Sequence, residues 1–367
     1  MIRPLWIEVN LKQLSRNLKA IRKHLKPGVK VVATIKQSAY GHGLIPVARE
    51  LSSQGIDSFG VGSIEEAIAL REDGFGGSIL VLSAVLDKYA GFFIRYKVTP
   101  SVVDIKFISK LNKEASKIDE VVPVHIEMDT GMGRLGFACR NVSSLAGQLK
   151  RFKNIKIEGV YTHFPVADSD PDFTNYQINS FNKFIKELDK EGITPDFRHC
   201  ANSTGLINYP KAHFNMVRPG LILYGVTPDL AVQADVKPVL SLKSKVIFIK
   251  KVKKGTSIGY GRIFFSKCPG YIATVAVGYA DGYPWSLSNC SRVIINGSFL
   301  NIAGRVCMDH IMVDAGKSKV SVGDDVILIG SYKNLKITAE DLAQLSGTIP
   351  YEIVSRLSLK IPRIYKS

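Results

Sequence analysis

An apolar, β-branched run that ends in a lysine is the segment of this chain best suited to chemistry. Residues 29–36 read VKVVATIK, which is typical of a buried strand. Lys36 is expected at the C-terminal end of that strand, followed by a loop with Gly41 and Gly43 and then a helix that begins near Leu44. A partly desolvated lysine loses its proton more easily and can form a Schiff base with an aldehyde. A solvated lysine at a strand end is the plain alternative.

The composition is that of an ordinary globular protein, with 367 residues, 46% hydrophobic and 22% charged. No run approaches the roughly 18 apolar residues of a membrane span, and the first residues lack the apolar core of a signal peptide. We therefore expect a cytoplasmic protein without a membrane partner. The five cysteines lack CxxC spacing, which indicates neither a disulfide framework nor a zinc site, and no metal is expected.

The formal charge of +17 raises the possibility of a nucleic-acid partner. The basic residues are dispersed, however, and the densest cluster, KVIFIKKVKKG at 245–255, resembles a strand and turn with a solvated lysine face. No nucleic-acid-binding motif accompanies it. We expect no nucleic-acid partner.

Strand-like and helix-like segments alternate through roughly the first 220 residues. Asn10 is a plausible helix N-cap, because leucine and isoleucine recur at helical spacing from Leu11 to Leu25. Further helices are expected within 64–73, 104–117 and 175–192. The expected strands are 29–36, 58–63, 78–83, 98–103, 121–128, 155–163, 196–202 and 214–218. This α/β alternation favours a closed (β/α)8 barrel of the TIM type over an open sheet.

The pattern changes after residue 225. A linker is expected at 227–238, and closely spaced strands with glycine turns follow it, with one short helix near 337–347. We therefore expect a barrel domain over 1–235 and an all-β domain over 236–367. Residues 1–10, which include a short isolated strand, are a candidate strand of the C-terminal domain.

Several polar residues fall at the C-terminal ends of the expected barrel strands, where active sites of this fold lie. They are Lys36, His163, Asn202, Ser203, Arg218 and Gly220. The loops after the seventh and eighth strands are the usual phosphate position. Ser203 offers a hydroxyl there, and Gly220 offers a backbone amide that a ligand can approach closely. The positions thus imply a phosphate-bearing cofactor.

Nine motifs then match, in order, those of a known family. They are IKQSAYGHG (35–43), MDTGMGRLG (128–136), YTHF (161–164), HCANS (199–203), VRPGLILYG (217–225), GYGR (259–262), VGYADGYP (277–284), GRVCMD (304–309) and PYEI (350–353). Together they resemble the bacterial alanine racemases from about residue 6 to about residue 353. The resemblance implies a pyridoxal 5'-phosphate enzyme of fold type III, a homodimer that interconverts L-alanine and D-alanine and supplies D-alanine for peptidoglycan.

By this resemblance two bases serve the reaction, because one base cannot reach both faces of the planar substrate carbon. Lys36 holds the cofactor and serves one face. Tyr260, from the β domain of the partner subunit, serves the other. The family places His163 and Arg218 in the chain of groups that lowers the pKa of this tyrosine, and it sets Arg218 against the pyridine nitrogen, where an arginine disfavours the pyridinium.

The resemblance also assigns residues that bind cofactor and substrate. Arg134 and the backbone amide of Met308 correspond to recognition of the substrate carboxylate, while Tyr279 and Asp309 come from the second subunit. Tyr279, Tyr351 and Cys307 also fit a plain core or turn role. The residues that correspond to cofactor contacts are Tyr40, His163, Asn202, Ser203, Arg218, Gly220, Leu221 and Tyr351.

The chain departs from the family at residue 127. Many members have a carbamylated lysine seven residues before the arginine of GMGR, and its carboxylate orients that arginine; here the position is Glu127. We hypothesise that Glu127 is the charge partner of Arg134, directly or through a water or an ion. Smaller departures are Gln37, Ser38 and Pro165.

Three alternatives remain open on the sequence. Serine racemases share these motifs, so motif spacing does not distinguish an enzyme for alanine from one for serine or for a broader set of amino acids. One additional hydroxyl on the substrate also changes discrimination only modestly. A non-catalytic pyridoxal phosphate carrier would lack the β domain and Tyr260. Barrel decarboxylases with a β domain are disfavoured by GYGR and VGYADGYP.

Overall fold

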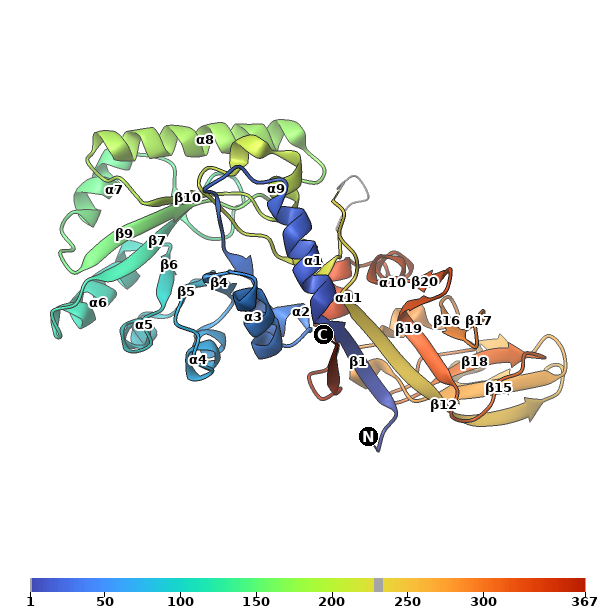
Figure 1. Ribbon diagram of the computed structural model, residues 1–367. Coiled ribbons are helices and arrows are strands. Elements are labelled where there is room, and N and C mark those ends of the chain that lie inside the picture. Colours follow the sequence, from blue (N-terminus) through green and yellow to red (C-terminus); the bar gives the residue numbers. More distant parts are fainter. Residues whose placement is uncertain (1, 228–233, 367) are drawn as a thin grey trace.

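The computed structural model describes residues 2–227 and 234–366, and it shows a barrel beside an elongated β domain (Figure 1). Residues 228–233, which belong to the expected linker, lie outside the described residues. Residues 1 and 367, at which the two expected domains begin and end, also lie outside them. No helix in the described ranges is long and apolar enough to cross a membrane.

Parallel strands form the barrel, in the order β3-β4-β5-β6-β7-β9-β10, and β11 pairs with β2 directly before β3. Backbone hydrogen bonds close the ring from Thr34 N to Pro219 O and from Arg218 N to Ala201 O, each 2.9 Å long. The strands are β2 Lys30–Val31, β3 Ala33–Thr34, β4 Ser58–Val61, β5 Ser78–Val81, β6 Thr99–Val102, β7 Val122–Asp129, β9 Ile155–Tyr161, β10 Phe197–His199 and β11 Met216–Val217. The prediction of a (β/α)8 barrel is confirmed.

Several barrel strands are shorter than predicted. The segment expected as a strand over 29–36 ends at Thr34, and the strand expected over 155–163 ends at Tyr161. Lys36 and His163 therefore lie just after their strands rather than within them. The apolar pattern continues past each strand because the loops at this end are also packed against the barrel, so periodicity alone does not locate the ends.

Helices lie around the barrel and begin at polar caps. Asn10 Oδ1 accepts a 2.8 Å hydrogen bond from Gln13 N, which confirms the predicted cap of α1. Helix α8 begins four residues earlier than predicted because Asp170 caps it and Pro171 occupies its first position. The helices are α1 Leu11–Arg22, α3 Leu44–Ser53, α4 Ile64–Glu72, α5 Ala90–Arg95, α6 Ile105–Ser116, α7 Val142–Leu149, α8 Pro171–Lys190 and α9 Ser203–Asn208.

The β domain is built on a largely antiparallel sheet in the order β17-β16-β19-β12-β1-β21, and β15 and β18 extend it from β12. Its strands include β1 Leu5–Asn10, β12 Leu240–Val252, β15 Gly270–Val275, β16 Arg292–Ile295, β17 Ser298–Asn301, β18 Ile311–Gly316, β19 Asp325–Tyr332, β20 Leu335–Ile337 and β21 Arg363–Lys366. The first strand of the chain thus pairs with β12 and β21, although it precedes the barrel.

Two helices complete this region. The short helix predicted near 337–347 is present as α10, Ala339–Ser346, with Thr338 as its cap. A second helix, α11 over Pro350–Ser355, was not predicted as a helix, since only its PYEI motif was noted. Figure 1 shows α11 beside α2, Lys36–Tyr40, where the two domains meet, and the two helices are in contact.

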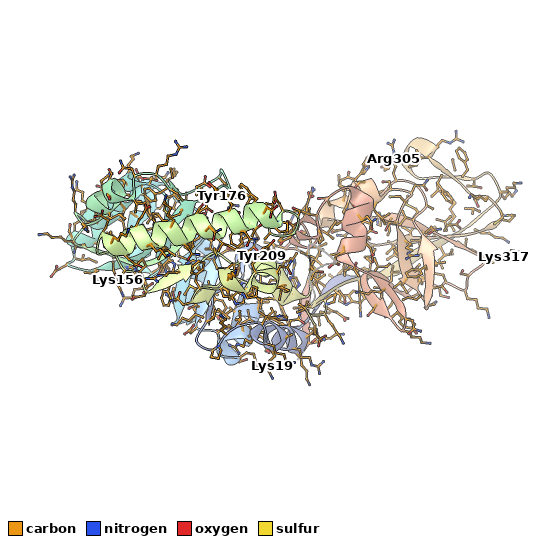
Figure 2. The ribbon with its side chains drawn as sticks, turned by 90° about the horizontal axis from the view of Figure 1, so that it is seen from above. Lys19, Lys156, Tyr176, Tyr209, Arg305 and Lys317 are labelled. Carbon is orange, nitrogen blue, oxygen red and sulfur yellow. The ribbon has the colours of Figure 1, made fainter. Side chains whose placement is uncertain are left out.

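Basic side chains are spread over both domains, as the sequence predicted. Figure 2 labels Lys19 and Lys156 on the barrel and Arg305 and Lys317 on the β domain, at well separated places. These four labelled basic side chains are therefore not gathered on one domain.

The tightest backbone contact at the domain junction involves Gly225. It has φ of +69°, and a Cβ atom there would lie 1.8 Å from Lys237 O. Gly255 has φ of +80°, but nothing lies within 4 Å of its Cβ position. We expect Gly255→Ala to lower the free energy of unfolding by about 1 kcal/mol and Gly225→Ala to lower it by at least about 2 kcal/mol more, because only the latter adds a clash. Denaturant unfolding of both variants measures the difference; equal losses would contradict the packing at Gly225.

Candidate active site

A cavity of about 120 Å³ lies at the C-terminal ends of the barrel strands and brings together most of the predicted barrel residues. Tyr351 enters it from α11, so the C-terminal segment supplies one wall. The cavity is lined by Thr34, Lys36, Tyr40, Leu82, Glu127, Arg134, Tyr161, His163, Asn202, Ser203, Arg218, Gly220, Leu221 and Tyr351.

The backbone after Lys36 is left-handed. In α2, Lys36–Tyr40, the four residues from Gln37 to Tyr40 have φ between +52° and +54°. Such a conformation costs roughly 1–2 kcal/mol per residue for side chains other than glycine. Glu66 stabilises the turn, because its carboxylate accepts hydrogen bonds from Ser38 N at 2.8 Å and from Gly62 N at 2.9 Å.

The C-terminal segment braces the same turn from outside the barrel. A Cβ atom on Gly41 would lie 2.4 Å from Val354 O of α11, and one on Gly43 would lie 2.0 Å from the hydroxyl of Tyr365 in β21. Arg363 Nε also donates to Gly41 O at 3.1 Å. The loop that carries Tyr40 is thus held between the barrel and residues near the chain end.

Lys36 lies in a strongly cationic environment. Burial lowers its pKa below the ordinary value of a lysine, and the charges of Arg134 and Arg218 lower it further. Its amine is therefore more easily deprotonated than a surface lysine, which suits it to nucleophilic attack and to proton transfer.

Arg218 is buried, with 4% of its surface exposed, and its guanidinium donates to neutral acceptors. Nη1 donates to His199 Nδ1 at 2.6 Å, and Nη2 donates to Thr162 O at 2.8 Å. A longer contact of 3.4 Å joins Nη2 to His163 Nδ1. The guanidinium carbon also lies 4.9 Å from the ring centroid of Tyr161, a cation–π distance.

A directional chain of hydrogen bonds runs from Arg218 across the barrel. An arginine can only donate, so His199 Nδ1 is the acceptor, and the neutral imidazole carries its proton on Nε2. His199 Nε2 then donates to His125 Nδ1 at 2.8 Å, and His125 Nε2 lies 3.5 Å from the carboxylate of Glu158. Burial, followed by the charge of Arg218, lowers the pKa of His199 well below its usual range. His199 is therefore neutral, as this chain requires.

The predicted phosphate residues form a cradle without an anionic group. Ser203 Oγ accepts from Gly220 N at 3.0 Å, and a Cβ on Gly220 would lie 2.7 Å from Tyr40 Oη, so only glycine leaves this space. Asn202 caps α9 by accepting from Gly205 N at 2.9 Å. Hydroxyl and amide groups are the donors that a phosphate binds, and these residues therefore fit the phosphate of a cofactor.

Glu127 is buried at 4% exposure and has a partner that the sequence did not suggest. Its Oε2 accepts a 2.7 Å hydrogen bond from the hydroxyl of Tyr161. Within the ranges that the structure describes, Glu127 and Arg134 line the same cavity but form no ion pair. Arg134 is exposed. A role for Glu127 as the charge partner of Arg134 thus stays a prediction.

Apart from Tyr351, the predicted residues of the β domain do not line the Lys36 cavity of their own chain. Tyr260 is 70% exposed and Met308 is 54% exposed, and Tyr279 and Asp309 also lie at the surface. Cys307 is half-buried, and its carbonyl accepts from Tyr279 N at 3.0 Å. Burial raises the pKa of the Cys307 thiol, which makes the thiolate less accessible.

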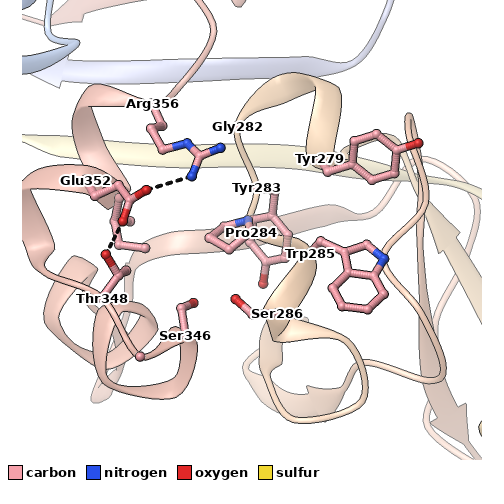
Figure 3. Close-up of a pocket in the computed structure, with 12 residues that line it drawn as sticks. Tyr279, Gly282, Tyr283, Pro284, Trp285, Ser286, Ser346, Thr348, Glu352 and Arg356 are labelled. Carbon is pink, nitrogen blue, oxygen red and sulfur yellow. Dashed lines mark hydrogen bonds and ion pairs between the residues drawn. The ribbon is translucent and has the colours of Figure 1, made fainter.

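A larger cavity of about 720 Å³ lies on the other side of α11 (Figure 3). It runs from Tyr279 and Trp285 to the end of α10. Its charged residues, Glu352 and Arg356, already pair with each other at 2.6 Å. Because α11 presents Tyr351 to one cavity and Glu352 to the other, the two cavities share this helix as a wall.

Sequence reasoning missed several residues of the site. Tyr161 and His199 lie inside the motifs YTHF and HCANS, but no role was predicted for them. Glu66 lies in the helix expected within 64–73, and no role was predicted for it either. The sequence signal that could have identified Glu66 was its place in the first turn of a helix, where a carboxylate is often close to free backbone N–H groups. Among the residues described, no group of three or more His, Cys, Asp or Glu could hold a metal ion.

Comparison with known proteins places this geometry in a family. Residues 9–228 match the family described as "Alanine racemase, N-terminal domain", and residues 239–365 match "Alanine racemase, C-terminal domain". An alanine racemase of Halothermothrix orenii is 41% identical over 369 residues, which cover 100% of this chain and 97% of the relative.

Solved structures agree with the sequence relatives. An alanine racemase from the D-cycloserine producer Streptomyces lavendulae has a TM-score of 0.95 at 30% identity, covering 100% of this chain and 97% of that one. A histidine racemase from Leuconostoc mesenteroides has a TM-score of 0.90 at 27% identity, covering 100% and 98%. The matches to both domains and the full-length identity lead to one conclusion: this chain belongs to the alanine racemase family of isomerases.

Proposed function

We propose that this chain interconverts L-alanine and D-alanine with pyridoxal 5'-phosphate, in an active site shared by the two subunits of a homodimer. The observation that carries the proposal is the cavity that joins Lys36 and Arg218 to a phosphate cradle. The role of the reaction is to supply D-alanine for peptidoglycan in the cytoplasm.

The residues of the cavity would bind two parts of the cofactor. Tyr40, Ser203, Gly220, Leu221 and Tyr351 would hold the phosphate, together with Asn202, and Arg218 would face the pyridine nitrogen. When bound, pyridoxal phosphate withdraws electrons from the substrate Cα, so that the Cα proton becomes acidic. Because Arg218 cannot accept a proton, it would disfavour protonation of that nitrogen and so would moderate this withdrawal.

Lys36 moves the proton on one face of Cα. Its lowered pKa, caused first by burial, favours the neutral amine, which is the form that accepts a proton. The turn after Lys36 is restrained by Glu66 and by the close contacts at the glycines at 41 and 43, and this restraint supports a fixed backbone position for Lys36.

Tyr260 of a second subunit moves the proton on the opposite face. In its own chain this phenol is exposed and lines no part of the Lys36 cavity. A phenolate that takes up and releases a proton is stabilised by a hydrogen-bond donor beside it. Burial and the charge of Arg218 lower the pKa of His163 to about 3. Neutral His163 accepts from Arg218 at Nδ1 and carries its proton on Nε2, from which it can donate to that phenolate.

Substrate recognition combines both subunits. Arg134 and the amide of Met308 would bind the substrate carboxylate, while Tyr279 and Asp309 would line the entrance. These β-domain side chains are exposed in one chain, which supports their covering by a partner. A broader specificity, including serine, is the second candidate, because the similar structure from Leuconostoc mesenteroides is named a histidine racemase.

The direct test is incubation of the purified holoenzyme with L-alanine, with separation of the enantiomers. We expect the mixture to approach equal amounts of both, with an absorbance of the bound cofactor in the visible range. Lys36→Ala should lose the activity and that absorbance, whereas Lys30→Ala, at an exposed position of β2, should keep both. No D-alanine from the wild type, or more rapid turnover of serine, would overturn the assignment to alanine.

Mixing two inactive variants tests whether the site is shared. Lys36→Ala and Tyr260→Phe should each lose nearly all racemase activity. After co-refolding or co-expression, half of the dimers carry one copy of each, and one of their two sites holds both intact bases. We therefore expect recovery to about a quarter of the wild-type activity. If the two bases came from one chain, the mixture would stay inactive.

Glu127→Gln tests the charge at residue 127, because it keeps the size of the side chain and its hydrogen bond with Tyr161. If the carboxylate supports Arg134, KM for alanine should rise about tenfold, with kcat less affected, from about pH 6 to about pH 9. Steady-state kinetics of the two proteins give the ratio. An unchanged kcat/KM over that range would limit Glu127 to its contact with Tyr161.

A further inference from the structure

Arg3, just before the first strand, holds two loops of the β domain. Its Nη1 donates to Asp281 Oδ1 at 2.6 Å, and its Nη2 donates to Asp281 Oδ2 at 2.7 Å. Nη2 also donates to the backbone carbonyl of Asp309 at 3.1 Å. One guanidinium therefore contacts the turn at residues 278–281 and the loop at 307–309.

The ion pair is stronger than an ordinary surface pair. Asp281 is buried, with 5% of its surface exposed, and its Oδ2 also accepts from Gly278 N at 2.9 Å. In the described part of the chain, Arg3 is the cation that pairs with this carboxylate. A buried carboxylate that loses its partner is strongly destabilised, and the fork geometry of arginine cannot be replaced by a single ammonium.

The two loops are also joined to each other. Tyr279 N donates to Cys307 O at 3.0 Å, and Ala280 N donates to Met308 O at 3.1 Å. A Cβ on Gly278 would lie 2.2 Å from Met308 O, so the backbones are in direct contact. Any shift of the turn that follows the loss of Arg3 must therefore move the loop that carries Met308.

We propose that Arg3 is a positioning residue for substrate recognition, because it holds Tyr279 and Met308 in the arrangement that they present to the neighbouring subunit. This inference rests on the proposed function, in which these two residues face the substrate. Arg3 does not touch the substrate. It acts through Asp281 and the carbonyl of Asp309.

The effect should be local because β1 does not depend on Arg3 for its place. The strand pairs with β12 from Leu5↔Ser244 to Val9↔Leu240 and with β21 from Ile7↔Arg363 to Asn10↔Lys366. Loss of the guanidinium therefore leaves the sheet intact and releases only the two loops.

Arg3→Ala, Arg3→Lys and a matched control test the proposal in the full-length holoenzyme. The control is Arg49→Ala, because Arg49 forms a comparable two-point ion pair with Asp73, at 2.9 and 2.5 Å, on the barrel surface. We expect KM for alanine to rise about tenfold in Arg3→Ala and less in Arg3→Lys, with kcat changed less than KM. Arg49→Ala should keep both parameters.

A second readout does not depend on turnover. The chain has two tryptophans, and Trp285 lies in the turn Trp285–Leu287, just after the loop that Arg3 holds. In a Trp6→Phe background, the fluorescence anisotropy of Trp285 should fall in the Arg3 variants and stay unchanged in Arg49→Ala.

The outcomes separate this inference from the proposed function. An unchanged KM together with an unchanged anisotropy overturns the role of Arg3, as does a fall in kcat and thermal stability without a change in KM. A wild-type protein without racemase activity would overturn the proposed function instead, and an unchanged anisotropy in the Arg3 variants would still overturn the loop-holding role. If Arg3→Ala does not fold, Arg3→Lys supplies both readouts.

Discussion

The site depends on one buried cation. Arg218 lies at the floor of the cavity, where an unpaired charge would cost several kcal/mol, yet its direct hydrogen-bond partners are carbonyls and imidazoles rather than a carboxylate. The nearby carboxylates, Glu127 and Glu158, contact Arg218 only through intervening side chains. Glu127 reaches it through Tyr161, whose ring lies under the guanidinium, and Glu158 reaches it through two histidines. The cation is therefore solvated by polar groups of the protein.

This arrangement also sets the protonation of its neighbours. Arg218 can only donate, so each imidazole that it contacts must be neutral at the accepting nitrogen. His199 and His163 both have pKa values lowered by burial and by this charge. Burial lowers the pKa of Lys36, and the charges of Arg134 and Arg218 lower it further. Burial and the buried arginine together thus favour the neutral forms of one amine and two imidazoles.

Strand periodicity predicted the barrel and the β domain, and the position of polar residues after apolar runs predicted six cavity residues, Lys36, His163, Asn202, Ser203, Arg218 and Gly220, because these are local signals. The family resemblance supplied Tyr40, Glu127, Arg134, Leu221 and Tyr351. The sequence did not predict the left-handed turn after Lys36, since Gln37, Ser38 and Ala39 have no preference for positive φ and the conformation is imposed by Glu66 and the C-terminal segment. It also gave Glu127 no link to Tyr161, because that contact joins two strands whose register is set by the whole barrel. Local patterns locate a residue on an element, whereas its partner depends on the closed fold.

The need to stabilise that turn explains why the end of the chain returns to the barrel. Four left-handed residues cost roughly 4–8 kcal/mol together, which the barrel offsets only in part through the two backbone bonds to Glu66. Val354 of α11 and Tyr365 of β21 close the space around Gly41 and Gly43, and Arg363 bonds to the same loop. Strand β21 pairs with β1, and β1 pairs with β12. The β-domain sheet is therefore connected through β21 to the loop that follows Lys36. The domain that is proposed to supply a base to the neighbouring subunit therefore also fixes the geometry of the lysine in its own.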